Sequence, residues 1–432
     1  MVRPYYPLSH SLWAATAGAA PETHVLQASL RADVAIVGAG FCGLSTALHL
    51  AEAGARVVVL DAREIGFGGS GRNGGQVIPG IKYDPSEIVA KFGAEQGQKV
   101  IDFVGGTADT VFDLIEKYAM DVPHVRRGWI QGAHTAAALQ LAERRVRDWR
   151  AQGVAARMLD KTAVSALLGT DAYLGGWLDP RGGGIQPLSF AYGLAKAAQQ
   201  RGVSIHTGSA VTSLAPERGG WTLKTAAGSE VCAEQVVLAT NGYTDGLWPH
   251  LQKTIIDANS FQIATEPLPP AIRSTILPEG QVSSDARNLL LYFRLDHAGR
   301  LLMGGRGTFA EPDPRAPRSW AHLDNVVRKL FPQTEGVAIA HRWCGHVAIT
   351  QDFLPHIHTP APGLTIDIGC QGRGVGLQTR MGQALAESIL TRNPAVLPFA
   401  PTPIRPFPFH ALRRVYLAAA VAWYRLTDGG VR

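Results

Sequence analysis

Three glycines near the start of the chain have the spacing of a phosphate-binding turn. Gly38, Gly40 and Gly43 form the pattern Gly-x-Gly-x-x-Gly. In this pattern the first glycine allows a tight turn, the second lets the backbone approach a pyrophosphate, and the third lets a helix pack closely on a strand. Asp61 ends the next strand-like run, where an acid can accept hydrogen bonds from the ribose hydroxyls of a dinucleotide. The spacing predicts a dinucleotide site without a 2′-phosphate; the alternative is a coincidental glycine cluster.

Two further glycine-rich loops could hold other parts of the same ligand. Residues 68–76 contain five glycines among polar residues, a composition that excludes a helix or a plain strand. Residues 369–376 are also rich in glycine and lead into a helical pattern. Backbone N–H groups at such a helix start could face the N1/O2 edge of a flavin, where negative charge develops on reduction. For both loops the alternative is an ordinary structural turn.

Strands and helices must hold these loops in place. A β-branched run at 33–37 precedes the first glycine turn, a helical pattern at 44–53 follows it, and a second buried run lies at 56–60. This order of strand, turn, helix and strand is typical of a Rossmann-like unit. Later segments continue the pattern with a helix at 188–200, a strand at 203–207, an antiparallel pair at 221–225 and 231–232, and a buried strand at 236–240.

Two long segments interrupt this unit. Residues 84–174 have mostly helical patterns, and residues 251–340 have the alternation of a hairpin-rich sheet. We therefore predict an α/β fold in which a Rossmann-like nucleotide-binding domain is interleaved with a mixed α+β substrate domain. The predicted boundaries are an N-terminal arm at 1–27, the nucleotide-binding domain at 28–84, 175–248 and 341–396, the substrate domain at 85–174 and 249–340, and a C-terminal tail with a short helix at 397–432.

A few side chains outside the glycine loops could take part in chemistry. His346 could shuttle a proton or bind a polar group of a substrate, although a lone histidine is more often structural. Tyr292 and Arg294 alternate on a predicted strand, so they should point to the same side; that side could be a substrate pocket or an exposed rim. Cys344 could attach a cofactor covalently, but a buried thiol that only packs is the simpler interpretation.

The composition limits the kinds of partner. The 432 residues carry a formal net charge of +6 without a long basic run, so we expect no nucleic-acid partner. The four cysteines, Cys42, Cys232, Cys344 and Cys370, form no CxxC pair. This spacing argues against a disulfide framework or a zinc site, and we predict no metal.

Membrane and targeting signals are weak in this sequence. The first residues lack the apolar run of a signal peptide, and no run is long enough to span a bilayer. We therefore expect a cytoplasmic protein without a transmembrane segment. The late apolar run at 416–424 lies between arginines and could touch a membrane surface, but a helix packed on the body is the favoured interpretation.

Taken together, the motifs resemble those of the D-amino-acid oxidase-like FAD-dependent oxidoreductases, which include glycine and sarcosine oxidases. The resemblance rests on the unit of strand, glycine turn, helix and Asp61 and on the loops at 70–76 and 372–376. It extends over about residues 30–395. The gamma-glutamylputrescine oxidase subgroup is the nearest in appearance. Further matching segments are 184–187, 239–243, 265–268, Trp343-x-Gly345, Thr350 and Pro355.

The resemblance implies that the nucleotide is FAD, that the Rossmann-like part is an FAD-binding domain, and that the reaction oxidises a C–N bond. In such enzymes the substrate's hydride passes to flavin N5, the imine is hydrolysed, and the flavin is reoxidised, often by oxygen. The implied substrate is a primary or secondary amine, such as a gamma-glutamyl-polyamine or an N-alkyl amino acid.

The motifs and the resemblance together give a set of candidate site residues. The candidate cofactor-binding residues are Gly38, Gly40, Phe41, Cys42, Gly43, Asp61, Ala62, Arg63, Gly69, Ser70, Arg72, Asn73, Gly74, Gly75, Gln76, Val211, Thr240, Asn241, Gly242, Gly372, Arg373, Gly374, Val375 and Gly376. The candidate catalytic residues are His346, Tyr292 and Arg306.

The sequence departs from the family pattern at two points that bear on the chemistry. Sarcosine-oxidase-like members carry a lysine near the flavin, whereas the corresponding segment 302–306 has none, so the acceptor could be oxygen or another electron carrier. The flavin-linking cysteine of sarcosine oxidase would fall near Gly345 rather than at Cys344, so we expect non-covalent FAD. Arg306 or Arg294 could bind a substrate carboxylate.

Two alternative functions stay open at the level of sequence. The first is an amine or amino-acid dehydrogenase of the same fold that passes electrons to a quinone or another carrier. The second is a flavin-binding partner protein without amine turnover.

Overall fold

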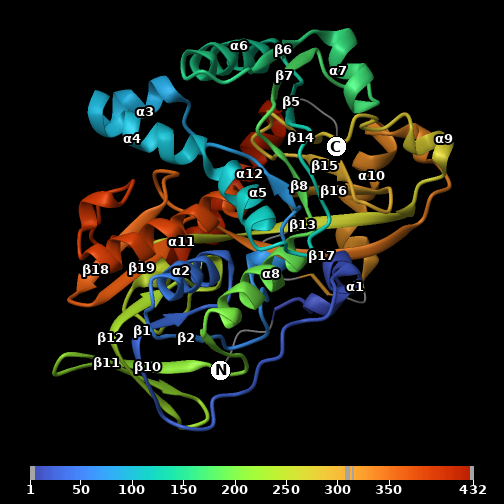
Figure 1. The fold of residues 1–432 in the computed structure, drawn as a ribbon. Coiled ribbons are helices and arrows are strands. Elements are labelled where there is room, and N and C mark those ends of the chain that lie inside the picture. The colour runs from blue at the N-terminus through green and yellow to red at the C-terminus, as the bar shows by residue number, and fades with distance from the viewer. Residues whose placement is uncertain (1–4, 307–311, 314–315, 429–432) are drawn as a thin grey trace.

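The computed structural model describes residues 5–306, 312–313 and 316–428, which form three β-sheets flanked by helices (Figure 1). The first sheet has a parallel centre in the order β19-β12-β1-β2-β9. Its central strands are buried over most of their length and its edge strand β9 is partly exposed. Such burial is typical of a parallel sheet and confirms the predicted Rossmann-like α/β part. These strands are β1 (Leu30–Val37), β2 (Val57–Leu60), β9 (Ser204–His206), β12 (Glu230–Leu238) and β19 (Leu364–Ile368).

The sequence predicts two separate strands, at 231–232 and 236–240. The structure instead has one continuous strand, β12, which ends at Leu238. Its first half pairs antiparallel with β11 (Gly220–Thr225), and its second half pairs parallel with β19. The polar residues Glu234 and Gln235 interrupt the apolar pattern where the strand changes partner. Strands β10 (Val211–Glu217) and β18 (His356–Ala361) extend the sheet antiparallel to β11 and β19.

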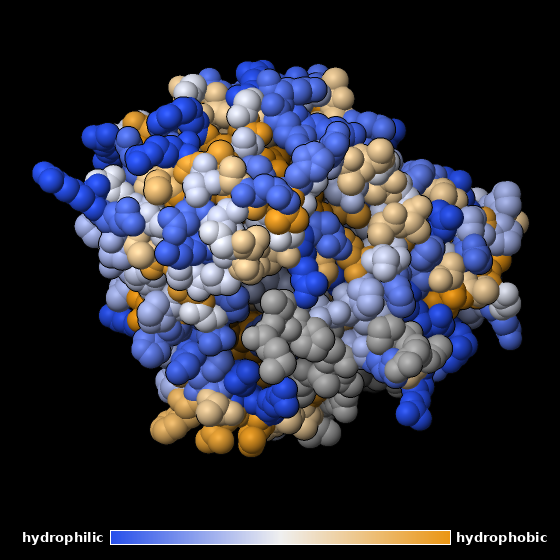
Figure 2. Space-filling view, turned by 90° about the horizontal axis from the view of Figure 1, so that it is seen from below, coloured by the Kyte–Doolittle hydropathy of each residue, from blue (hydrophilic) through white to orange (hydrophobic). Residues whose placement is uncertain are grey.

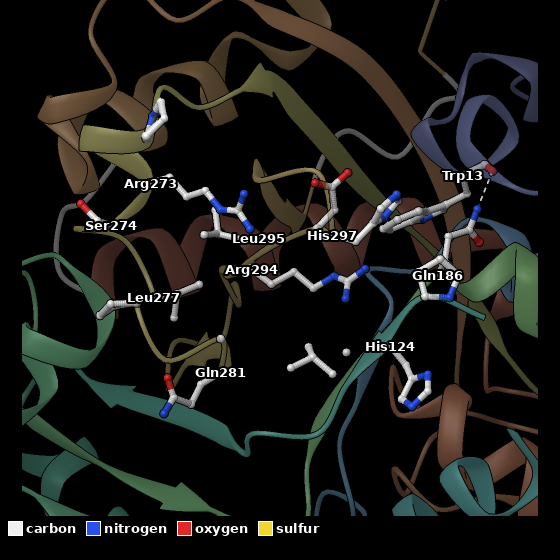
Figure 3. Close-up of a pocket in the computed structure, with 17 residues that line it drawn as sticks. Trp13, His124, Gln186, Arg273, Ser274, Leu277, Gln281, Arg294, Leu295 and His297 are labelled. Carbon is white, nitrogen blue, oxygen red and sulfur yellow. Dashed lines mark hydrogen bonds between the residues drawn. The ribbon is translucent and has the colours of Figure 1, made fainter. Parts of the chain in front are cut away.

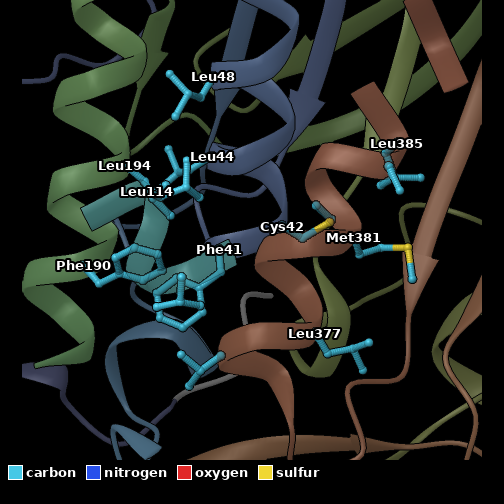
Figure 4. Close-up of a cluster of buried hydrophobic side chains, with 14 of the residues drawn as sticks. Phe41, Cys42, Leu44, Leu48, Leu114, Phe190, Leu194, Leu377, Met381 and Leu385 are labelled. Carbon is cyan, nitrogen blue, oxygen red and sulfur yellow. The ribbon is translucent and has the colours of Figure 1, made fainter. Parts of the chain in front are cut away.

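Three helices cover one face of the first sheet: α2 (Phe41–Glu52), α8 (Pro187–Gln200) and α11 (Gly374–Thr391). The Phe41 and Phe190 rings lie 5.3 Å apart between α2 and α8, and Figure 4 shows Met381 of α11 beside Cys42 on the other side of α2. Helix α5 (Thr107–Lys117) packs on α11 from outside. This core fixes the first turn of α2 against its neighbours.

The second sheet has the order β17-β13-β16-β15-β14-β5-β7-β6. One face packs on α10 (Ala321–Leu330), where the Phe293 and Phe331 rings lie 5.1 Å apart. Residues that alternate with Phe293 therefore face the glycine loops. The strands are β5 (Trp129–Ala133), β6 (Arg157–Leu159), β7 (Gly175–Asp179), β13 (Ile256–Pro267), β14 (Val282–Asp285), β15 (Tyr292–Leu295), β16 (Arg300–Arg306) and β17 (Ile339–Ile349).

A small third sheet contacts the second one, since the Gln76 side chain donates to the carbonyls of Ser283 and Phe293. It has the order β3-β8-β4, with β3 (Gln76–Val77), β8 (Gly183–Ile185) and β4 (His124–Val125). Several helices lie on the outside of the molecule (Figure 1): α3 (Pro85–Phe92), α4 (Ala94–Gly105), α6 (Ala136–Ala151), α7 (Lys161–Leu168) and α9 (Pro270–Arg273). Thr135 and Asp160 cap α6 and α7 through their side chains, as expected for helix starts.

The N-terminal arm is more ordered than the predicted irregular segment. Ser11 caps a short helix, α1 (Leu12–Thr16), in which Trp13 is buried. The Trp13 Nε1–H donates to the carbonyl of Asn73 at 2.7 Å. The sequence alone could not show this contact because its partner lies 60 residues away.

The C-terminal helix α12 (Arg413–Thr427) is held at its C-terminal end. The carboxylate of Asp428, just after it, accepts hydrogen bonds from the Asn288 N–H, the Asn288 side chain and the Leu289 N–H. Val415 and Trp423 remain largely exposed, so the helix is anchored to the body but does not bury its whole apolar side. Seen from below, the surface carries apolar side chains in several separate groups among polar ones (Figure 2).

Two strands lie in a different sheet from the one that the predicted domain division suggests. The division assigned 175–248 and 341–396 to the FAD-binding part, yet β7 and β17 pair within the second sheet. The domain boundaries themselves stay a proposal.

The structure also bears on disulfides, metals and membrane spans. None of the four cysteines, which all lie within the described residues, forms a disulfide. Within residues 5–306, 312–313 and 316–428, no three His, Cys, Asp or Glu side chains are grouped as a metal site would require. None of the helices in this part of the chain has the length and apolar character needed to cross a bilayer.

Candidate functional site

The first glycine turn joins β1 to α2. Gly38 has φ +114°, and a Cβ there would lie 2.8 Å from the carbonyl O of Ala239. A Cβ at Gly43 would overlap the carbonyl O of Gly38, so only glycine allows this close packing of helix on turn. The N-cap residue of α2, Gly40, has no side chain to cap the helix. Apart from the Phe41 N–H, which donates to Ser70, the positive end of the helix suits an anion.

Ser70 connects the second loop to this helix start. Its Oγ accepts a hydrogen bond from the Phe41 N–H at 2.9 Å, and a Cβ on Gly40 would lie 3.0 Å from the same oxygen. The side chains of Phe41 and Cys42 are buried in the core of Figure 4. Any cofactor contact at these two residues would therefore involve their backbone.

Asp61 lies at the end of β2 and stabilises the glycine turn. Its carboxylate accepts hydrogen bonds from the Ala39 N–H at 2.7 Å and the Arg63 N–H at 2.8 Å. Burial raises the pKa of Asp61, and these two hydrogen bonds oppose the rise. Ala62 and Arg63 are exposed. The contact of Asp61 with a ribose stays a prediction, as do contacts of Ala62, Arg63 and the strand-start residue Val211.

In the second loop, the polar side chains mainly stabilise the loop itself. The buried Arg72 donates to the carbonyls of Phe67 and Tyr6 at 2.6 Å each. The Asn73 side chain donates to the carbonyls of Gly69 and Ser70 and accepts from the Gly75 N–H. Gln76 donates to two carbonyls of the second sheet. The side chains of Asn73 and Gln76 are therefore used within the protein, and the loop would present mainly its backbone to a ligand.

Two side chains of the second sheet pack against the turn at Gly74 and Gly75. A Cβ on Gly74 would lie 2.9 Å from the Tyr292 ring, and a Cβ on Gly75 would lie 2.8 Å from Arg294 Nη2. Gly75 also has φ +67°, which a residue with a Cβ rarely adopts. Tyr292 and Arg294 thus point to the same side, as predicted, and that side faces the glycine loop rather than solvent.

The third loop leads into α11 without a side-chain cap. Gly372 has φ +81°, and Arg373 donates to the carbonyl of Pro79 at 2.7 Å. Burial lowers the pKa of Arg373 to about 10. A Cβ on Gly376 would lie 2.8 Å from the carbonyl O of Thr107, so this glycine and buried Val375 serve packing, while Gly374 begins the helix.

The segment after β12 lies next to the third glycine loop. Asn241, in the 3-10 turn Asn241–Tyr243, accepts a hydrogen bond from the Gly369 N–H at 3.0 Å through its side chain. Thr240 bonds to Thr244 through the two hydroxyls, and a Cβ on Gly242 would lie 3.2 Å from the carbonyl O of His346. The structure therefore brings the three glycine loops and the segment at 240–243 into one region.

The three candidate catalytic residues fall into two groups. Tyr292 shares a 2.6 Å hydrogen bond with Ser260, and burial raises its pKa to about 12. Arg306 lies opposite Ser260 across β13 and β16, and burial lowers its pKa. Tyr292 and Arg306 therefore form one desolvated polar wall.

His346 points to the other face of the second sheet. It lies opposite Asn259 on β13, and successive residues of a strand face opposite ways, so His346 and Arg306 face apart. The His346 ring packs against Tyr243 and Tyr5, with centroids 5.2 and 5.3 Å away. Sequence reasoning missed Tyr5 in this cluster because only tertiary packing brings the arm here.

The three glycine loops, at 38–43, 68–76 and 369–376, form a cradle. Two observations show that this cradle fits FAD. At the starts of α2 and α11 the N-cap residue gives no side-chain cap, and each start follows a glycine turn whose space a Cβ would fill. In addition, the Arg72 Nη2 atom is buried and has no hydrogen-bond partner within the described part of the chain. Two helix starts with positive ends suit a ligand with both a pyrophosphate and a ring that gains negative charge.

The chain is similar to known proteins in sequence and in structure. Residues 33–388 match the family described as FAD dependent oxidoreductase. The chain is 35% identical to a probable oxidoreductase OrdL from Haemophilus influenzae over 83% of each chain. It is 32% identical to a gamma-glutamylputrescine oxidoreductase from Escherichia coli over 97% of this chain and 98% of that one.

Solved structures share the fold at low sequence identity. Glycine oxidase from Geobacillus kaustophilus superposes with a TM-score of 0.70 at 21% identity, over 84% of this chain and 95% of that one. L-Amino acid deaminase from Proteus myxofaciens superposes with a TM-score of 0.71 at 19% identity, over 89% and 95%.

Proposed function

Because the chain belongs to the family of FAD-dependent oxidoreductases, we propose that it oxidises the C–N bond of a primary or secondary amine. The substrate class proposed is a gamma-glutamyl-polyamine or an N-alkyl amino acid. The similarity to a gamma-glutamylputrescine oxidoreductase over nearly the whole chain supports this class, as do matches to a glycine oxidase and a sarcosine oxidase subunit.

The residues proposed to hold FAD are those of the three glycine loops. The N–H groups at the start of α2 would bind the pyrophosphate, Asp61 the ribose, and the loops at 69–76 and 372–376 the flavin. When bound, FAD accepts a hydride from the carbon next to the amine nitrogen, and water then hydrolyses the resulting imine. We propose non-covalent binding, since Cys344 is fully buried beside Phe261, its partner on β13, in the sheet core.

The observation that carries the proposal is the polar wall of Tyr292 and Arg306, in which the Tyr292 ring lies against Gly74 and burial shifts the pKa of both groups. An alkylamine must be neutral to give up a hydride, and a desolvated pocket favours the neutral form. The raised pKa of Tyr292 keeps its hydroxyl protonated, so it can orient a substrate by hydrogen bonding. Arg306 would bind the carboxylate of an N-alkyl amino acid.

Anaerobic mixing of the purified yellow protein with a panel of amines tests the proposal. We expect one class of amine to bleach the visible flavin band, and carboxylic acids without an amine to leave it unchanged. Return of the colour in air would identify oxygen as the electron acceptor, and return only with a quinone would identify a dehydrogenase. A flavin that no amine bleaches would contradict amine oxidation and favour a flavin-binding partner protein.

The variant Tyr292→Phe distinguishes contact of Tyr292 with the substrate from binding of FAD by the glycine loops. It removes only the hydroxyl that bonds to Ser260, so FAD content should stay the same while the rate of bleaching falls. An unchanged rate would show that the wall does not contact the amine.

A further inference from the structure

The C-terminal helix α12 turns an apolar stripe towards solvent. Leu412, just before the helix, and Val415 and Trp423 within it are 57%, 69% and 63% exposed. Residues three, seven, ten and eleven places after Leu412 fall on the same side of a helix. The exposed residues on this side are all apolar: Ala411, Leu412, Val415, Ala418, Ala419, Ala422 and Trp423.

Helix α6 shows the opposite and more usual arrangement. Within 138–150 its exposed residues are polar or charged: Gln140, Glu143, Arg144, Arg147 and Arg150. In α12 the half-buried residues are apolar too, among them Leu417 and Val421, so both sides of the helix carry apolar groups. An exposed apolar stripe with a polar edge marks an interaction surface.

The segment that carries this stripe is basic. Residues 388–427 contain five arginines and neither Asp nor Glu. Arg405 and Arg414 are exposed, and Arg413 is half-buried in the first turn of α12. Positive charge beside an exposed apolar stripe complements a surface of anionic lipid head groups.

The body beside this segment carries one further cation and an acid that faces inwards. Lys253 is exposed, and its carbonyl accepts the Phe407 N–H at 2.8 Å. Asp257 lies on β13, and its Oδ2 is 4.0 Å from the Nδ1 of the buried His346. The carboxylate therefore belongs to the interior of the protein, whereas Lys253 adds to the positive charge outside.

A second copy of this chain fits the stripe less well than a membrane surface does. Pairing two copies through α12 would bring two basic segments together, and like charges repel. A stable protein interface has roughly 20–30 residues a side, whereas the stripe and the preceding Phe409 offer eight exposed apolar residues. An amphipathic helix on a membrane needs only one such face.

We propose that α12 docks the protein on a membrane surface that contains anionic lipids. Phe409, Leu412, Val415 and Trp423 would enter the boundary between head groups and acyl chains, while the arginines would meet the lipid phosphates. The helix would lie in the plane of the surface. The hydrogen bonds to Asp428 hold its C-terminal end on the protein body, so docking of α12 carries the whole protein to the membrane.

The stripe is separate from the glycine cradle and from the cavity beside it. This cavity has a volume of about 420 Å³, and its walls come from α1, β4, β8, β15 and the segment that follows α9. Figure 3 shows Arg294 and Gln281 reaching it from two of these segments. Substitutions on the outward side of α12 touch neither place, so FAD content and flavin bleaching serve as controls for correct folding.

Cosedimentation of the holoprotein with lipid vesicles tests the proposal. We expect binding to vesicles of phosphatidylglycerol and phosphatidylcholine in equal parts, little binding to phosphatidylcholine alone, and weaker binding as salt is added. Val415→Glu should weaken binding by about tenfold or more, since it removes a buried apolar side chain and adds a negative charge. Arg414→Gln should weaken it about fivefold, the effect of one cation near an anionic surface.

The matched controls alter the same residue types elsewhere on the surface. Leu174 is 48% exposed and Arg144 is exposed on α6, and Leu174→Glu and Arg144→Gln should bind vesicles like the unmodified protein. Brominated lipid should quench part of the tryptophan fluorescence, and Trp423→Phe should remove this quenching.

Four outcomes would overturn the proposal. They are no binding to the anionic vesicles, equal binding to both kinds of vesicle, equal losses in Val415→Glu and Leu174→Glu, and quenching that persists in Trp423→Phe. A dimer that Val415→Glu dissociates, without vesicle binding by the unmodified protein, would identify a second copy as the occupant instead. Each of these readouts is independent of amine turnover.

Discussion

The variant Gly382→Ala tests how closely the two ligand-facing helices must pack. Gly382 lies in α11, where a Cβ would be 2.6 Å from the Cys42 carbonyl O, 2.6 Å from the Ser45 Cβ and 2.8 Å from the Thr46 N. Each of these atoms belongs to the backbone or Cβ of α2, so no flexible side chain can move aside. To reach ordinary van der Waals distance, α11 and α2 would have to separate by roughly 0.8 Å.

Two opposing effects determine the magnitude. Alanine is about 1 kcal/mol more favourable than glycine inside a helix, whereas overpacking of a well-packed core costs about 1–3 kcal/mol. Three close contacts that cannot relax place the steric cost in the upper part of that range. We therefore expect a net loss of about 1–2 kcal/mol in the free energy of unfolding.

The loss should extend to cofactor binding, because the starts of α2 and α11 both face the cradle. We expect FAD affinity to fall by about tenfold, since 1.4 kcal/mol corresponds to a factor of ten. The measurements are urea unfolding of the holoprotein and fluorescence titration of the apoprotein with FAD.

The matched control is Gly105→Ala at the end of α4. A Cβ there has its nearest neighbour at 3.4 Å, the far end of the Arg181 side chain. This change should leave both stability and FAD affinity almost unaltered. If Gly382→Ala behaves like Gly105→Ala in both assays, the argument that helix proximity shapes the cradle is wrong.

Three other outcomes follow from the structure. Burial raises the pKa of Asp367 to about 7 from 3.8; its carboxyl ionises first in the unfolded chain, so stability should fall as pH rises between those values. In urea series across that window, Asp367→Asn should remove this fall, and equal slopes would refute the assignment. Acid precipitation should release all FAD into the supernatant, whereas colour that stays with the pellet would show a covalent link. Asp428→Ala should cost about 1–3 kcal/mol and speed tryptic cleavage within α12, because the hydrogen bonds from Asn288 and Leu289 are lost; unchanged cleavage would show that α12 is held by other contacts.

The local features of the nucleotide-binding part could be predicted from the sequence. The run at 33–37, the glycine turn, the following helix and the run at 56–60 all appear as β1, α2 and β2. Their signals are local: hydrophobic periodicity, glycine spacing and an acid at a strand end each act over a few residues. The same holds for the helix that follows the third glycine loop.

The hydrogen-bond partners of the polar side chains in the second loop could not be predicted from such local patterns. Arg72, Asn73 and Gln76 are candidate cofactor contacts, and most of their hydrogen bonds in the structure go to the chain's own backbone. Their acceptors include the carbonyl of Tyr6, far away in the sequence. Spacing within the loop carries no information about such partners.

Sequence by itself therefore determined which backbone segments can bind a dinucleotide, since glycine spacing and hydrophobic periodicity are properties of neighbouring residues. Tertiary structure alone decided which side chains meet. The register of β13 against β16 and β17 places Arg306 and His346 on opposite faces of one sheet. The folding of β8, β15 and the segment after α9 around a common space brings Arg294 and Gln281 to one cavity. Both outcomes depend on pairing between distant segments, where a shift of one residue would turn every side chain to the other face.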